Sequence, residues 1–201
     1  MDDTFRQISV EVYLPSSVLR GKLITKHQRL SDYLNLKMSD EAIKLEEVEI
    51  QTGKVETSSV KPSNALINRR QVTVVVELSP GPSTTGEKEA ISPVERESWS
   101  VLIEAGSLWV QGDLHLLPGA ELNSFALGNS SFISLTQATF VDSPGSEPRT
   151  FMINREKVNC LMPLKKVLPR IADPGPQKQE YAENANPSQS SRRSFRSFKE
   201  L

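Results

Sequence analysis

The amino-acid sequence predicts a mainly β protein. We expect two tandem small domains, each a strongly bent five-stranded sheet or partly open barrel with one short helix, followed by a disordered C-terminal tail. Three observations predict this fold: an internal repeat, alternation of apolar and polar residues along short segments, and a change of composition near residue 173. Hydrophobic residues make up 37 % of the 201 residues, which indicates a modest core together with unfolded segments.

The internal repeat is sharpest between two six-residue segments. Residues 67–72, Ile-Asn-Arg-Arg-Gln-Val, match residues 153–158, Ile-Asn-Arg-Glu-Lys-Val, at four of six positions. Shorter matches precede them in the same order, and they pair residues 20–23 with 111–114, 30–33 with 122–125, and 43–45 with 133–135. Several matches in one register indicate duplication. We therefore predict one domain at residues 7–78 and a second at 98–172.

The first domain opens with a strand–turn–strand pattern. Apolar and polar residues alternate from Ile8 to Leu14, which is typical of a half-buried strand. Residues 15–17, Pro-Ser-Ser, supply a turn, and residues 18–25 form a second strand. Gly21 lies inside this strand, where a glycine often marks a bulge or a sharp bend.

A short helix is expected over residues 30–36, with Ser31 and Asp32 placed to cap it. Further strands are expected at residues 43–50, 65–67 and 72–76. Asn68 and Arg69 separate the last two strands. Because Asn tolerates positive φ, this pair predicts a tight corner.

The second domain repeats these elements. Strands are expected at residues 99–104, 108–116, 133–141, 151–153 and 158–162. Gly112 lies inside the second of these strands, and Asn154-Arg155 forms the corner before the last.

The remaining segments differ in composition. Residues 79–97 are rich in Pro, Gly and charge and are predicted to be a flexible linker. Residues 173–201 form the tail, and its first part, 173–190, is polar with few apolar anchors and is expected to be disordered.

Charge and cysteine content narrow the class of protein. The formal net charge is −1, which argues against a dedicated nucleic-acid binder. One cysteine cannot form an internal disulfide. The sequence has no apolar run of about 18 residues, so no transmembrane helix is expected. The acidic, polar N-terminus does not resemble a secretory signal, and we expect a cytoplasmic protein.

Candidate catalytic residues are few. His27 and His115 stand at different distances from their glycines, so they do not form a repeated pair, and a strand-end position is favoured for both. Cys160 lies beside Leu161 and Met162 and is interpreted as a small buried hydrophobe. The sequence has no phosphate-binding glycine loop, nucleophile elbow or zinc-protease helix. We therefore expect no enzymatic activity, no cofactor, no metal and no small-molecule substrate.

The repeated pairs Asn68-Arg69 and Asn154-Arg155 allow two interpretations. As ligand-contacting turns, they would present an arginine to phosphate or to a base. As structural turns, the Asn would bond local backbone and the Arg would pack along the edge of the barrel. The structural interpretation is favoured.

The C-terminal end combines apolar and basic residues. Phe195, Phe198 and Leu201 recur at helical spacing. Four basic residues surround them, namely Arg192, Arg193, Arg196 and Lys199. Such a segment is typical of docking onto a partner protein, an anionic membrane surface or RNA. The alternative is a solvated end in which the phenylalanines have no partner.

Three segments stand where a known family has its motifs: Gly21-Lys22-Leu23, the segment from Asp32 to Leu36, and Ile67-Asn68-Arg69. In these segments the chain resembles the Sm-like family. Residues 29–35 also resemble an Arg-Leu-Ser-Asp-x-Leu-Asn segment of uncharacterised small bacterial β-domains. The first resemblance implies a small β-barrel and RNA binding, whereas the second implies no activity.

These observations predict a non-enzymatic binding or assembly protein. Its tandem β-domains would mediate self-association as a homo-oligomer or contact a protein partner, and its tail would dock or anchor. The alternative is an Sm-like RNA-binding protein. The two hypotheses differ in where Arg69 and Arg155 lie: a shared basic surface favours RNA binding, and arginines engaged by the protein itself favour assembly.

Overall fold

The computed structural model describes residues 5–27, 29–36, 42–51, 62–78, 96–122, 128, 130–143 and 145–167. The chain divides into two compact units, Met1–Pro169 and Arg170–Leu201, and every described residue belongs to the first. Most of the predicted linker, at 79–95, and the predicted tail lie outside the described residues.

The described residues form ten strands, one α-helix and two short 3-10 helices. In chain order they are β1 (Arg6–Tyr13), β2 (Val18–Thr25), α1 (Leu30–Asn35), β3 (Ala42–Gln51), β4 (Asn64–Asn68), η1 (Arg69–Gln71), β5 (Val74–Glu77), β6 (Glu97–Ala105), β7 (Leu108–Leu116), β8 (Phe132–Phe140), β9 (Arg149–Asn154), η2 (Arg155–Lys157) and β10 (Val158–Val167).

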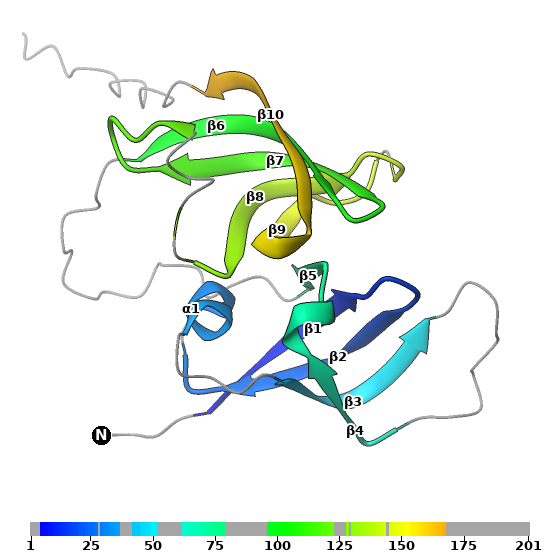
Figure 1. Ribbon diagram of the computed structural model, residues 1–201. Helices are drawn as coiled ribbons and strands as arrows, with labels where there is room; N and C mark the ends of the chain where they lie inside the picture. Colours follow the sequence, from blue (N-terminus) through cyan, green and yellow to red (C-terminus); the bar gives the residue numbers. More distant parts are fainter. Residues whose placement is uncertain are drawn as a thin grey trace, which may run out of the picture. The chain divides into compact units, whose positions relative to one another are not determined.

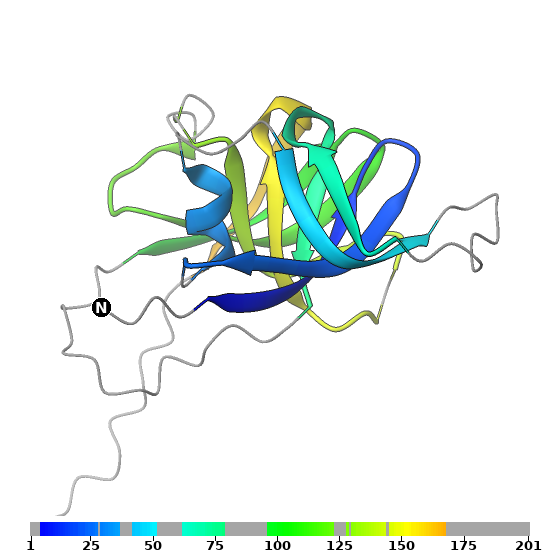
Figure 2. The same cartoon turned by 90° about the horizontal axis from the view of Figure 1, so that it is seen from below.

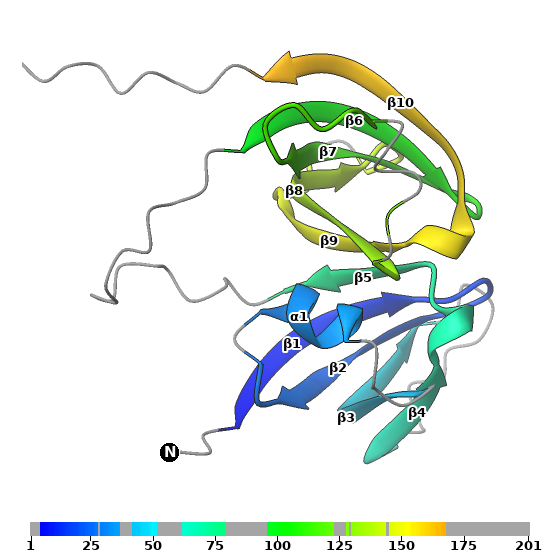
Figure 3. The ribbon, with the colours of Figure 1, turned by 60° about the vertical axis from the view of Figure 1, so that its left-hand side comes forward.

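All ten strands belong to one antiparallel sheet, in the order β10-β6-β7-β8-β9-β5-β1-β2-β3-β4 (Figure 1). We call β1–β5 the first half and β6–β10 the second half. Within each half the order is fifth strand, first, second, third, fourth. The halves meet where β5 pairs with β9 (Figure 3). We call this contact the joint.

The prediction of two separate five-stranded sheets, each with a helix, is therefore wrong. Three residue pairs make the sheet continuous: Val74 with Ile153, Val75 with Met152, and Val76 with Phe151. Within the described residues α1 is the one complete α-helix. Leu122, in the region expected to hold a second, is also helical, and residues 123–127 lie outside the described residues. The cause of the error is physical, because alternation determines which face of a strand is buried and not which edge finds a partner.

The two strand glycines lie where the sheet register shifts. The pairing of β2 with β3 shifts between Arg20 and Lys22, on either side of Gly21. The pairing of β7 with β8 shifts in the same way around Gly112. A Cβ on Gly21 would lie 2.9 Å from the Glu46 carbonyl oxygen, and one on Gly112 would lie 2.9 Å from the Ala138 Cβ. Each glycine thus permits a close approach at a bulge.

The hydrophobic core has two clusters, and each receives side chains from both halves. The first cluster contains residues of the first half, such as Ile8 and Leu45, together with Phe132 and Met152 of the second half. The second cluster contains residues of β6–β9 together with Val74 and Val76 of the first half. The joint is therefore part of the core.

Helix α1 starts differently from the sequence expectation. Arg29 precedes its first residue with an extended backbone and makes no side-chain cap, whereas Ser31 and Asp32 lie inside the helix. The Asp32 and Tyr33 amides bond to the Arg29 carbonyl oxygen instead. The helix lies beside β8 (Figure 2), which it reaches through Asn35.

Candidate functional site

Each repeated Asn-Arg pair forms a corner in which the Asn caps a 3-10 turn. The Asn68 Oδ1 accepts a hydrogen bond from the Arg70 amide at 2.9 Å. The Asn154 Oδ1 accepts one from the Glu156 amide at 3.1 Å. Both asparagines have φ near −60° (−61° and −66°), so the expectation of positive φ is wrong. They act as N-caps, which need an acceptor side chain on extended backbone.

Asn154 also ties the two halves together at the joint. Its Nδ2 donates to the Val72 carbonyl oxygen at 2.8 Å and to that of Arg69 at 3.3 Å. Its backbone amide donates to the Thr73 carbonyl oxygen at 2.9 Å. The side chain is only 4 % exposed, and both ends of its amide are bonded. Asn68, at the equivalent corner of the first half, is exposed.

A second asparagine bridges the halves from α1. The Phe132 amide donates to the Asn35 Oδ1 at 2.8 Å, and the Asn35 Nδ2 donates to the Phe132 carbonyl oxygen at 3.1 Å. The side-chain amide of Asn35 thus makes the two hydrogen bonds to Phe132 that the backbone of a neighbouring strand would make at the start of β8. The sequence singled out Asn35 only as part of a motif and gave no signal for its partner.

The two corner arginines lie against the protein itself. The Arg69 guanidinium lies over the Phe132 ring, with its Cζ 5.5 Å from the ring centroid. The Arg155 Nε donates to the Ser130 carbonyl oxygen at 2.8 Å, and its Nη2 contacts the Ser130 Oγ at 3.0 Å. Burial lowers the pKa of both guanidinium groups. Both arginines therefore serve internal contacts in the described part of the chain.

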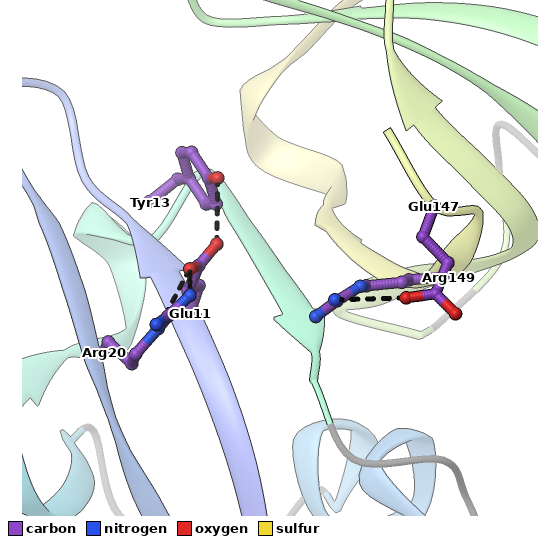
Figure 4. Close-up of polar contacts among 5 residues, drawn as sticks. All are labelled: Glu11, Tyr13, Arg20, Glu147 and Arg149. Atoms are coloured by element: carbon purple, nitrogen blue, oxygen red, sulfur yellow. Dashed lines mark hydrogen bonds and ion pairs between the residues drawn. The ribbon is translucent and has the colours of Figure 1, made fainter. Parts of the chain in front are cut away.

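A polar cluster lines one side of the joint (Figure 4). The Arg20 Nη2 donates to the Glu11 Oε1 at 2.6 Å, and the Tyr13 hydroxyl donates to the Glu11 Oε2 at 3.1 Å. On the other half, the Arg149 Nη2 lies 3.4 Å from the Glu147 Oε2. These five residues border an open hollow of about 240 Å³.

Aromatic rings form part of this hollow. The ring centroids of Tyr13 and Phe140, and those of Phe140 and Phe151, lie 4.8 Å apart in each pair. Burial, and then the neighbouring Glu11 carboxylate, raise the pKa of Tyr13 to about 12. Each arginine of the cluster is matched by a glutamate, so the hollow carries balanced charge. The sequence did not predict this cluster, because Glu11, Tyr13 and Arg20 of the first half lie near Glu147 and Arg149 of the second half through the pairing of β5 with β9.

A second hollow, of about 610 Å³, lies among turns. Its lining includes Pro15 and Ser17 of the β1–β2 turn, Gly106 and Ser107 of the β6–β7 turn, and Lys157. It brings together turns from the two halves.

The other sequence candidates lie apart from the joint. The His115 Nε2 lies 2.7 Å from the Thr136 Oγ1, and the His27 ring lies 6.4 Å from that of Tyr33. Cys160 is half-buried on β10. The described residues contain no cluster of three or more His, Cys, Asp or Glu residues that could hold a metal ion.

The predicted docking residues, Arg192, Arg193, Phe195, Arg196, Phe198, Lys199 and Leu201, lie outside the described residues. Among the helices of the described part, none is long and apolar enough to cross a membrane. In comparisons with known proteins, no family model, no curated protein and no solved structure matches the chain.

Proposed function

We propose that this chain is a non-enzymatic binding or assembly protein, with a body of tandem β-repeats that self-associates or contacts a protein partner and a C-terminal segment that docks a partner. One observation carries the proposal. The repeated Asn-Arg corner is used in the second half to join one sheet edge to another, through the bonds of Asn154 to the backbone of Arg69 and Val72. The equivalent corner of the first half, at Asn68, could then join the β4 edge to another sheet edge in the same way.

The proposal treats the two halves as repeats of one unit. Its support is the common strand order, the register shifts at Gly21 and Gly112, and the capped 3-10 turns at Asn68 and Asn154. The 3-10 corner between the fourth and fifth strands also supports the Sm-like resemblance of the repeat. The single cysteine suits the proposed cytoplasmic location.

RNA binding is the alternative, and the positions of Arg69 and Arg155 weigh against it. Both guanidinium groups lie against residues of the protein itself, at Phe132 and Ser130. We therefore expect little RNA binding at physiological salt. Salt-sensitive binding of micromolar or tighter affinity that falls in the variant Arg69→Ala with Arg155→Ala would favour the alternative.

The docking role of the tail is tested by recruitment. Phe195→Ala with Phe198→Ala should abolish recruitment of a partner without a change in the melting temperature of the body, because burial of each Phe contributes about 1.5–3 kcal/mol. Ser194→Ala with Ser197→Ala is the matched control and should recruit like the wild type. If the phenylalanine variant recruits every partner at wild-type strength, the docking role is wrong.

A further inference from the structure

We propose that the β4 edge of one copy pairs with the β10 edge of a second copy of this chain, in the same register as the internal joint. The sheet would then continue head to tail from copy to copy. This inference rests on the proposed assembly function and deepens it by naming the partner and the surface.

The two strands that end the described sheet are the counterparts of the two that meet at its joint. β4 ends one side and is the fourth strand of its half, as β9 is of the other half. β10 ends the other side and is the fifth strand of its half, as β5 is. Each copy therefore presents one fourth-strand edge and one fifth-strand edge, which is the combination that pairs internally.

Equivalent side chains are buried at the joint and exposed at the β4 edge. The alignment that places Asn68 on Asn154 also places Leu66 on Met152. Met152 is 0 % exposed and packs into the core of the neighbouring half, whereas Leu66 is 75 % exposed. Asn154 is buried and Asn68 is exposed. The β4 edge thus presents the apolar side chain and the amide nitrogen that a joint requires, without a second neighbouring strand in the described residues.

The β10 edge shows the same contrast. Its residues Cys160, Leu161 and Met162 are half-buried, and they align with Val74, Val75 and Val76, which are at most 3 % exposed. We apply the register of the β5–β9 pairing to β10 of one copy and β4 of the next. Cys160 then pairs with Ile67, Leu161 with Leu66 and Met162 with Ala65 of the neighbouring copy. Pro163, which has no amide hydrogen, falls just beyond these three pairs and would end the ladder.

The β4 edge lacks several features that normally prevent edge pairing. Its five residues, Asn-Ala-Leu-Ile-Asn, include no charged residue and no proline. A contact between two different edges is heterologous. Repetition of this contact gives a closed ring if the rotation from one copy to the next brings the last copy back to the first, and a filament if it does not.

The first test measures the mass of the purified full-length chain by sedimentation velocity over a concentration series. We expect the mass to rise above that of a monomer. Leu66→Arg should keep the chain monomeric with wild-type thermal unfolding, because Leu66 is largely exposed. Leu117→Arg is the matched control: Leu117 is 58 % exposed and lies outside both edges, so this variant should associate like the wild type. If Leu66→Arg does not fold, Leu66→Asn tests the same contact.

A mixing experiment tests the head-to-tail geometry. Cys160→Arg blocks the β10 edge and Leu66→Arg blocks the β4 edge, so each variant alone should be monomeric. An equimolar mixture should form a dimer with one copy of each. A wild-type chain that stays monomeric at every concentration, or a folded Leu66→Arg variant that associates like the wild type, would overturn the inference. Recruitment by the tail is scored separately, so a monomeric chain that still docks its partner would overturn this inference and leave the partner-binding part of the proposed function standing.

Discussion

Gly112 shows how a single residue sets the distance between strands. An added Cβ would meet the Ala138 Cβ at 2.9 Å and the Thr136 carbonyl oxygen at 3.1 Å, so a strand must move. We expect Gly112→Ala to lower the free energy of unfolding by about 1–3 kcal/mol. Gln111→Ala, at the exposed neighbouring position, should change it by less than about 0.5 kcal/mol. Denaturant unfolding measures both, and equal values for the two variants would contradict the close-approach account.

Tyr13 gives a pH-dependent signature of the cluster beside the joint. Its pKa is raised to about 12, first by burial and then by Glu11. Because the folded pKa lies above the unfolded one, the stabilisation from the protonated phenol is fully present below the ordinary tyrosine pKa and is lost as pH rises through about 12.

Ultraviolet titration of tyrosinate should therefore show a late component that belongs to Tyr13. Tyr13→Phe should remove this component, and Glu11→Gln should move it only part of the way down, because burial is the larger cause. A wild-type titration with no late component would contradict the half-buried, hydrogen-bonded position of Tyr13.

At the same scale, the sequence pointed to the corner residues and to local backbone bonds of their asparagines, but not to the contact of Asn154 with the other half. The repeat pointed to Asn68 and Asn154 because identical short motifs are visible in sequence. Their role as caps depends on the backbone turn that follows, and the second role of Asn154 depends on the Val72 carbonyl oxygen of the other half. No local sequence pattern predicts this contact between Asn154 and Val72, which are 82 residues apart in the chain.

At the scale of elements, the joint between β5 and β9 is held by apolar side chains that cross it. Met152 is fully buried in the core cluster of the first half. Met152→Ala should lower the free energy of unfolding by about 2–5 kcal/mol, because it leaves a cavity. Leu66→Ala removes a side chain at the equivalent position of the exposed edge and should cost the monomer less than about 0.5 kcal/mol.

Denaturant unfolding at a concentration where the chain is monomeric makes this comparison. Equal costs for the two alanine variants would contradict the assignment of Met152 to the core of the joint.

The strands themselves were largely predictable, whereas their partners were not. Alternation located β1, in which Ile8, Val10 and Val12 are buried as expected. The consecutive Val74, Val75 and Val76 are all buried, which is typical of a strand covered on both faces. This run was a usable signal that β5 lies inside the sheet. It did not identify β9 as the neighbour, since edge pairing depends on backbone groups that every residue possesses.

At the scale of the whole molecule, the sequence suggested duplication and association, but it predicted two separate sheets where the structure has one. A linker rich in Pro and Gly favours separate domains, yet a short edge contact outside the linker joins the two halves into one sheet. The described sheet then ends on one side with a fourth strand, β4, and on the other side with a fifth strand, β10. In the proposed assembly, copies of the chain join through β4 and β10 as the halves join through β9 and β5.

Cysteine cross-linking tests this claim at the level of individual pairs. In a Cys160→Ser background, Leu66→Cys with Leu161→Cys places thiols on strands expected to be opposite each other in neighbouring copies, within disulfide reach. Val75→Cys with Met152→Cys is the internal reference, because these residues are paired within one chain. Leu117→Cys with Leu161→Cys is the control for random contact.

On mild oxidation, we expect covalent multimers on a non-reducing gel for the variant Leu66→Cys with Leu161→Cys alone, and an internal disulfide for the internal reference. An internal disulfide in the reference variant, with no more multimer from the edge variant than from the control, would contradict the claim.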